Sequence, residues 1–311
     1  MVNPYFCYCL SFIIALMLYS LRWSNLYPSL SAALVAFLIL TIIAQALAGF
    51  RFTRKHTPTF RRFRVKMTYG PWIVTTFLYG LWSMEFAHGG GVPLVNILLN
   101  QPFDYKLFGI PTLHVFLVTF SSFYTVFLFH HYLSQKSPQI LFLFAINLLT
   151  AVLIYNRGML LFNISASAIL FLIYLGRPPR KVVLWFVPSI LFLCLLFGVM
   201  GTLRVSNEAH TSYADDNFLQ TAGASEQFLE SWVPSEFFWV YLYATSPLAN
   251  LEANIALNDP LPSSVAVVTG WINNEILFDF ISKRINAYTG DTRAIQKRIH
   301  GPFNASTVYS G

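Results

Sequence analysis

Two arginines stand at the ends of apolar stretches, where a charged side chain is costly. Arg157 lies between two such stretches with almost no loop around it, and Arg204 follows the last of them. A guanidinium makes two parallel charge-assisted hydrogen bonds and stays protonated, so it is well suited to bind phosphate. We therefore expect both arginines to bind an anion. The alternative is that each extends to the membrane interface and binds no ligand.

Carboxylate and imidazole groups follow Arg204 closely. Glu208, His210 and Asp216 are candidates for a general base, because these side chain types accept protons in catalysis. A solvated loop is the simpler interpretation of the same residues. Asp215 and Asp216 form a weak metal motif, since no histidines stand at ligand spacing near them. The sequence predicts neither a metal nor a cofactor.

A glycine-rich loop, Gly89–Pro93, follows an apolar stretch that contains Glu85. The loop is either a flexible exit from a helix or a backbone patch that meets a ligand at Gly91 and Pro93. It is not a nucleotide-phosphate loop, because no Gly-Lys-Ser/Thr run follows it. An acid inside an apolar stretch predicts a buried partner, and one of the arginines is the expected partner of Glu85.

Seven apolar stretches must position these groups. The chain is 56% hydrophobic and 11% charged, whereas about a quarter of the residues of soluble proteins are charged. Only helices satisfy the backbone of such stretches in lipid, so we expect an all-α, polytopic membrane helix bundle (1–204) and a long, partly helical outer segment (205–311). The expected spans are Pro4–Ser20, Pro28–Phe50, Gly70–Ala87, Pro111–Tyr132, Gln139–Asn156, Gly158–Gly176 and Val182–Leu203.

The distribution of charge predicts the orientation in the membrane. Eleven basic residues lie in the segments after the second, fourth and sixth stretches, and four lie at the opposite loop ends. Basic loops stay in the cytoplasm, so the N-terminus is predicted to be cytoplasmic and residues 205–311 to lie outside. The net charge of +7 then suits an anionic lipid leaflet and needs no nucleic-acid partner.

The predicted outer segment contains two helical pieces. Residues 235–257 are rich in aromatic side chains, which favour the membrane interface, and residues 271–287 form a second amphipathic piece. Cysteines are absent from this segment and occur only in the apolar stretches, at Cys7, Cys9 and Cys194. A disulfide framework is therefore excluded.

Several of these features together resemble the O-antigen polymerase family of bacteria, the Wzy-type oligosaccharide repeat unit polymerases. The similarity covers residues 67–311 and depends on the order and placement of short motifs. They are GGVPL at 90–94, the single Arg157, FG at 197–198 with GTLR at 201–204, YLYATSPLANL at 241–251 and PFNAST at 302–307.

The resemblance implies a multi-pass glycosyltransferase of the bacterial inner membrane that acts in lipopolysaccharide biosynthesis. Such enzymes join oligosaccharide repeat units carried on undecaprenyl pyrophosphate at the periplasmic face, among membrane lipids and with a chain-length regulator as partner. Arg157 and Arg204 would stabilise the leaving pyrophosphate, the electrostatic role that usually dominates such catalysis. Tyr241, Tyr243 and Asn250 would shape the sugar site.

Members of that family carry further spans after the outer loop, whereas this chain ends at Gly311. The resemblance therefore implies a truncated product that is inactive if those spans are needed. Three other functions compete: a flippase for lipid-linked oligosaccharides, an O-antigen ligase and a non-catalytic scaffold. A transporter is expected to show inverted repeats and discontinuous helices, and a ligase shares the donor but uses another acceptor.

Overall fold

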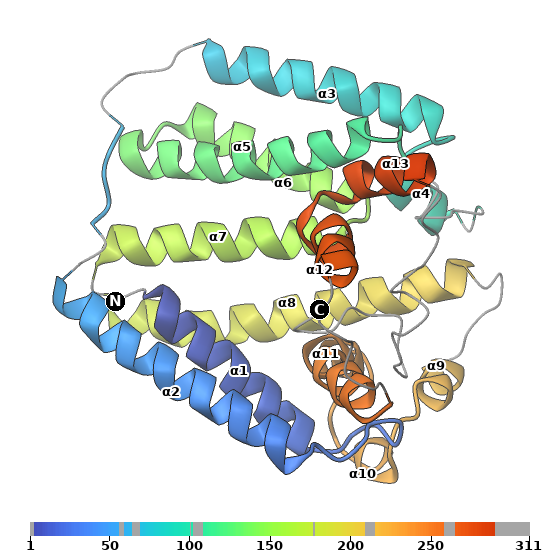
Figure 1. Cartoon of the computed structure of the whole chain (residues 1–311). Coiled ribbons are helices and arrows are strands. Elements are labelled where there is room, and N and C mark those ends of the chain that lie inside the picture. The colour runs from blue at the N-terminus through green and yellow to red at the C-terminus, as the bar shows by residue number, and fades with distance from the viewer. Residues whose placement is uncertain are drawn as a thin grey trace. The chain divides into compact units, whose positions relative to one another are not determined.

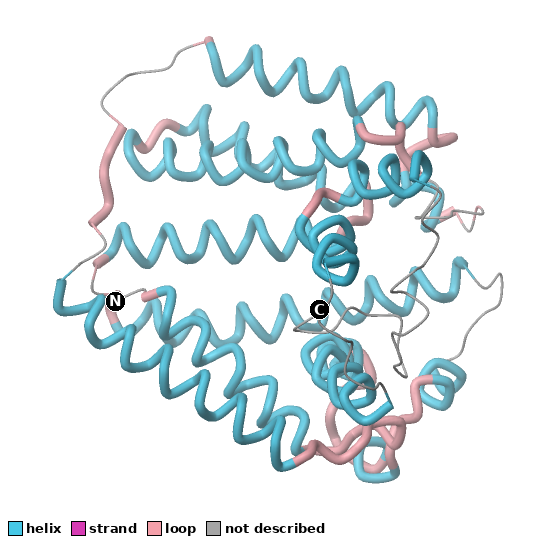
Figure 2. The backbone as a smooth tube through the Cα atoms, viewed as in Figure 1, coloured by secondary structure: helices cyan, strands magenta, loops and turns pink. Residues whose placement is uncertain are grey.

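The computed structural model describes residues 3–55, 59–63, 69–99, 101, 108–176, 178–208, 215–257 and 265–289. The structure is 79% helical. Its described residues form no strand beyond an isolated bridge between Ser24 and Ala224, as Figure 2 shows. The predicted all-α class is confirmed.

Each of the seven expected apolar stretches corresponds to a helix. In chain order the helices are α1 (Pro4–Ser20), α2 (Ala32–Lys55), α3 (Gly70–His88), α4 (Pro93–Leu98), α5 (Leu113–Gln135), α6 (Pro138–Leu153), α7 (Arg157–Leu175), α8 (Arg180–Glu208), α9 (Asp215–Thr221), α10 (Glu226–Leu229), α11 (Phe237–Leu257), α12 (Val265–Trp271), the π-helix η1 (Ile272–Ile276) and α13 (Asp279–Thr289), as labelled in Figure 1.

Four of these helices are long and apolar enough to cross a membrane: α2, α5, α7 and α8 up to Leu203. The apolar helices α1 and α6 are shorter, with 17 and 16 residues, and about 20 residues are needed to cross the hydrocarbon core. Helix α3 contains Thr75, Tyr79, Ser83 and Glu85, which lower its hydropathy. The chain is thus a candidate membrane protein, and the count of seven spans stays a prediction.

The chain divides into two compact units, each of which draws on separate stretches of sequence. Unit 1 comprises Met1–Cys7 and Ala48–Phe218, and unit 2 comprises Tyr8–Leu47 and Leu219–Gly311. From the sequence, we expect a boundary between residues 204 and 205, where the membrane spans end and the outer segment begins. The division into two units does not test that boundary.

Unit 1 is built around α5. This helix packs against α3, α6 and α7, while α6 also packs against α7, α3 and the short α4. In Figure 1 the C-terminal ends of α3 and α6 and the N-terminal ends of α5 and α7 lie at the same end of unit 1, on the right of the view. We call this the loop-rich end of unit 1.

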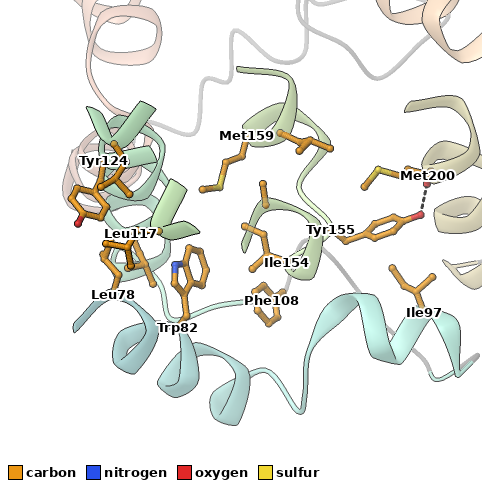
Figure 3. Close-up of a cluster of buried hydrophobic side chains, with 14 of the residues drawn as sticks. Leu78, Trp82, Ile97, Phe108, Leu117, Tyr124, Ile154, Tyr155, Met159 and Met200 are labelled. Carbon is orange, nitrogen blue, oxygen red and sulfur yellow. Dashed lines mark hydrogen bonds between the residues drawn. The ribbon is translucent and has the colours of Figure 1, made fainter. Parts of the chain in front are cut away.

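Buried apolar side chains from these helices form one cluster, shown in Figure 3. It includes Trp82 of α3, Phe108 in the loop before α5, and Tyr155 and Met159 around the start of α7. Polar side chains also link the helices inside unit 1, such as Asn147 on α6, whose Nδ2 donates to Thr75 Oγ1 over 3.1 Å. Interhelical hydrogen bonds of this kind hold membrane helices together where lipid provides no hydrophobic drive.

Unit 2 joins the loop between α1 and α2 to the segment around α10 and α11. Trp23 packs against the rings of Phe228 and Tyr241, and Tyr27 stacks on Tyr241 with 5.6 Å between ring centroids. Hydrogen bonds follow the same path: Trp23 N–H donates to Tyr241 Oη over 3.1 Å, and Tyr27 Oη lies 2.8 Å from Thr245 Oγ1. The aromatic residues of the predicted outer helix therefore pack against the first loop.

Candidate functional site

Arg157 is the first residue of α7 and is buried, with 9% of its surface exposed. Its Nη1 donates to the carbonyl oxygen of Phe197 on α8 over 3.4 Å, and the guanidinium carbon lies 4.7 Å from the centroid of the Phe197 ring. The side chain thus extends along α8 inside unit 1. Both interpretations of Arg157, as an arginine that extends to the interface and as an anion-binding residue, stay predictions.

A tight turn between α6 and α7 sets the position of this arginine. Tyr155 has a φ of +56°, a conformation in which a non-glycine residue is strained. Its hydroxyl donates to the Met200 carbonyl of α8 over 2.7 Å, drawn as a dashed line in Figure 3. Asn156 then caps α7 by accepting the Met159 N–H over 2.9 Å. Residues on both sides of Arg157 are therefore fixed, and the start of α7 is preorganised.

A narrow cleft adjoins the guanidinium of Arg157. It is lined by Leu160, Leu161 and Ile164 of α7 and by Leu193, Leu196, Phe197 and Met200 of α8. Its volume of about 10 Å³ is close to the space of one water molecule. A phosphate needs more room, so an anion would reach Arg157 only when α7 and α8 separate or from the loop-rich end.

A second pair of ionisable groups lies at the loop-rich end of unit 1. The Glu85 carboxylate is fully buried, and its Oε2 lies 2.8 Å from Nδ1 of His114 on α5. Its Oε1 accepts the Ile110 N–H over 3.2 Å. The expectation that Glu85 pairs with an arginine is wrong: its partner is His114. His114 was not identified from the sequence, because the pairing depends on how α3 packs against α5.

The glycine-rich loop packs closely inside unit 1. A Cβ on Gly89 would lie 2.6 Å from the Phe108 ring, and one on Gly91, at φ +134°, would lie 2.8 Å from Asn96 Oδ1. Pro93 begins α4 and is buried. Close packing thus explains why glycine stands at positions 89 and 91, whereas a flexible exit and ligand contact at Gly91 and Pro93 both stay predictions.

The other expected site residues fall into two groups. Tyr241 and Asn250 are buried within unit 2, with 1% and 0% exposed, whereas Tyr243 is 55% exposed. Arg204 and Glu208 lie in α8 and Asp216 lies in α9, but the positions of these three side chains are outside the described part of the structure, as is all of His210. The structure therefore brings Arg157 and the Glu85–His114 pair to one end of unit 1 and does not test the other candidates for a base.

Unit 2 has a hollow of its own beside the aromatic packing. It measures about 620 Å³ and is lined by residues 16–35 of the end of α1, the first loop and the start of α2, among them Tyr19, Arg22, Asn25 and Tyr27. Tyr19 and Tyr27 stack with 5.2 Å between ring centroids. Tyr241 does not line the hollow; it stacks on Tyr27, which does.

Comparison with known proteins identified no relative of this chain. No family model, no curated protein and no solved structure matches this chain. The site must therefore be interpreted from its own chemistry. In the described part of the chain, no group of three or more His, Cys, Asp or Glu side chains is placed to hold a metal ion. What the described residues offer is a buried cation and a carboxylate–imidazole pair.

Proposed function

We propose that this chain is a membrane glycosyltransferase similar to the O-antigen polymerases, which joins oligosaccharide repeat units carried on undecaprenyl pyrophosphate. The observation that supports this most is the burial of Arg157 at the start of the apolar helix α7. A guanidinium costs about 2.5–3.5 kcal/mol at the centre of a membrane helix and less toward its ends. A pyrophosphate bound at that position would accept two parallel hydrogen bonds from the guanidinium, and the N-terminus of α7 adds a favourable dipole.

The reaction needs charge stabilisation more than it needs a cofactor. A hydroxyl of the incoming unit attacks the anomeric carbon of the growing chain, and a new C–O bond forms as the bond to the pyrophosphate oxygen breaks. The leaving undecaprenyl pyrophosphate takes the electron pair. Arg157, joined by Arg204 in this proposal, stabilises that charge, and preorganised donors of this kind usually contribute most to catalysis.

The topology that the proposal needs agrees with the packing of unit 2. The loop between α1 and α2 and the segment after residue 204 are both predicted to lie outside the membrane. Within unit 2 they contact each other through the Ser24–Ala224 bridge and the Ser225 N–H, which donates to the Trp23 carbonyl over 2.8 Å. An even number of spans between them, as in the predicted topology, allows this contact. Location in the bacterial inner membrane with a cytoplasmic N-terminus belongs to the proposal.

The hollow in unit 2 is a candidate for carbohydrate binding within that unit. Its polar side chains and its tyrosines offer the hydrogen bonds and aromatic faces that carbohydrate rings bind. Tyr27 lines the hollow, and Tyr241 stacks on the Tyr27 ring. Tyr243, which is exposed, remains a candidate for direct contact.

A gel of surface polysaccharide tests the proposed function in cells. Cells that lack the gene are complemented with this chain, and lipopolysaccharide is separated by size. The proposal predicts a single repeat unit on the lipid A core in the deletion strain and a restored ladder after complementation. Loss of every capped species in the deletion strain would indicate a ligase or a flippase instead.

A further inference from the structure

We propose that His114 is the general base of this glycosyl transfer and that Glu85 positions it. This step rests on the proposed function. Imidazole is the side chain that most often accepts protons near neutral pH. Glu85 and His114 form an ion pair inside unit 1.

The partners of Glu85 determine which nitrogen of His114 is available. When Glu85 is ionised, its carboxylate only accepts hydrogen bonds, and Nδ1 of His114, 2.8 Å from Oε2, is then the donor. The lone pair of the neutral ring is then on Nε2. No partner for Nε2 lies among the described residues, and 21% of the side chain is exposed. The pair therefore presents a basic nitrogen to the surroundings and keeps its carboxylate inside.

Close packing holds the imidazole in this orientation. The rings of Trp82 and Phe108 stand edge-on to it, with centroids at 5.9 and 5.6 Å. The backbone at Gly109 passes directly over the pair at φ +99°, where a Cβ would lie 2.6 Å from Glu85 Oε2 and 2.7 Å from His114 Cγ. Glycine is therefore required at this position, and the ring has little freedom to turn.

A purely structural role does not explain why the buried group is an acid. Burying a carboxylate costs several kcal/mol more than burying a neutral amide, and Gln at position 85 would also accept the Ile110 N–H. A carboxylate offers something an amide does not, since it stabilises the imidazolium that forms when His114 takes up a proton. This is how a buried carboxylate assists a histidine base in other enzymes.

The pair lies at the same end of unit 1 as the start of α7, which Arg157 occupies. Trp82 and Phe108, which enclose His114, belong to the same buried cluster as Tyr155 and Met159, which flank Arg157 in the sequence (Figure 3). Base and guanidinium thus share the loop-rich end of unit 1. Nε2 accepts the hydroxyl proton as the oxygen bonds to the anomeric carbon, and Arg157 receives the charge of the departing pyrophosphate. The proton leaves later to water, so all atoms and charges balance.

The test measures polymerisation by the purified full chain in lipid nanodiscs supplied with a polyprenyl-pyrophosphate-linked repeat unit. We expect His114→Asn to lower the rate by about 100- to 10,000-fold, the usual contribution of a general base. We expect the acid limb of the wild-type pH–rate profile to disappear in this variant. Among the described residues Glu85 is the titratable group in contact with His114, so Glu85→Gln should shift that limb and lower the rate less.

Two controls separate catalysis from folding. His88→Asn replaces an exposed histidine on the same helix as Glu85 and should leave the rate and the pH profile unchanged. Added imidazole should restore activity to His114→Ala, which no structural role predicts. If the wild type polymerises and His114→Asn does so at the same rate with the same pH profile, the assignment is wrong while the proposed function stands. A wild-type chain that makes no polymer overturns both.

Discussion

Replacing Arg157 by methionine should separate activity from stability. Methionine has similar length, fits a helix and fills irregular space. The exchange removes the 3.4 Å hydrogen bond to the Phe197 carbonyl and the 4.7 Å contact with its ring. A bond this long is at the weak end of about 0.5–1.5 kcal/mol, and a cation–π contact contributes about 0.5–2 kcal/mol.

The same exchange also removes a desolvation cost. A buried guanidinium costs up to about 2.5–3.5 kcal/mol and less near a helix end. Loss and gain are of similar size, so Arg157→Met should change the free energy of unfolding by no more than about 1 kcal/mol in either direction. Transfer should nevertheless fall by about 100- to 1,000-fold, the effect of removing one donor from a developing negative charge.

Two measurements on the same purified protein check this prediction. Thermal unfolding in detergent reports stability, and polymer formed from the lipid-linked repeat unit reports activity. Arg157→Lys keeps the positive charge but loses the planar guanidinium that makes two parallel hydrogen bonds, so it should retain part of the activity. Arg54→Met, at the exposed end of α2, should behave like the wild type. A large loss of stability in Arg157→Met with activity falling in proportion would refute the reasoning, because the arginine would then be structural.

Three further results are expected. Gly109→Ala should destabilise the protein by about 2–4 kcal/mol, since it combines overpacking with an unfavourable positive φ; an unchanged melting temperature would contradict the packing over the buried pair. Burial raises the pKa of the Tyr27 hydroxyl, so stability present below pH about 10 should be lost as the pH rises above it, and less steeply in Tyr27→Phe; equal slopes in an alkaline melt would count against this. In a background without native cysteines, Asn25→Cys should react with a membrane-impermeant maleimide on intact spheroplasts and Lys55→Cys should not; the reverse pattern would invert the topology.

The helices were predictable because lipid requires long apolar runs. All seven apolar stretches correspond to helices, but the ends differ: α2 continues to Lys55 and α8 to Glu208, beyond the ends expected at Phe50 and Leu203. The length of an apolar run reflects the thickness of the hydrocarbon core. A helix can continue past that run into polar residues, and it ends where its backbone groups find other hydrogen-bond partners. The polar ends of these two helices were therefore missed.

The site was predictable only in part. The position of Arg157 between two apolar stretches made it a candidate for anion binding, whereas its burial against α8 was not predicted. The partner of Glu85 was not predictable in the same way, because His114 comes 29 residues later and the pairing depends on how α3 packs against α5. Likewise, the aromatic pattern of Tyr241 suggested a membrane surface, and only the three-dimensional contact with Trp23 and Tyr27 shows that it packs inside unit 2.

The most direct test of the proposed function is the mass of the first product. The purified chain in nanodiscs is incubated with an undecaprenyl-pyrophosphate-linked repeat unit, and the lipid extract is analysed by mass spectrometry. A polymerase produces a lipid-linked species carrying two repeat units together with one equivalent of free undecaprenyl pyrophosphate. Recovery of the starting compound alone, under conditions in which the protein remains folded, would contradict the proposal that this chain transfers glycans between lipid carriers.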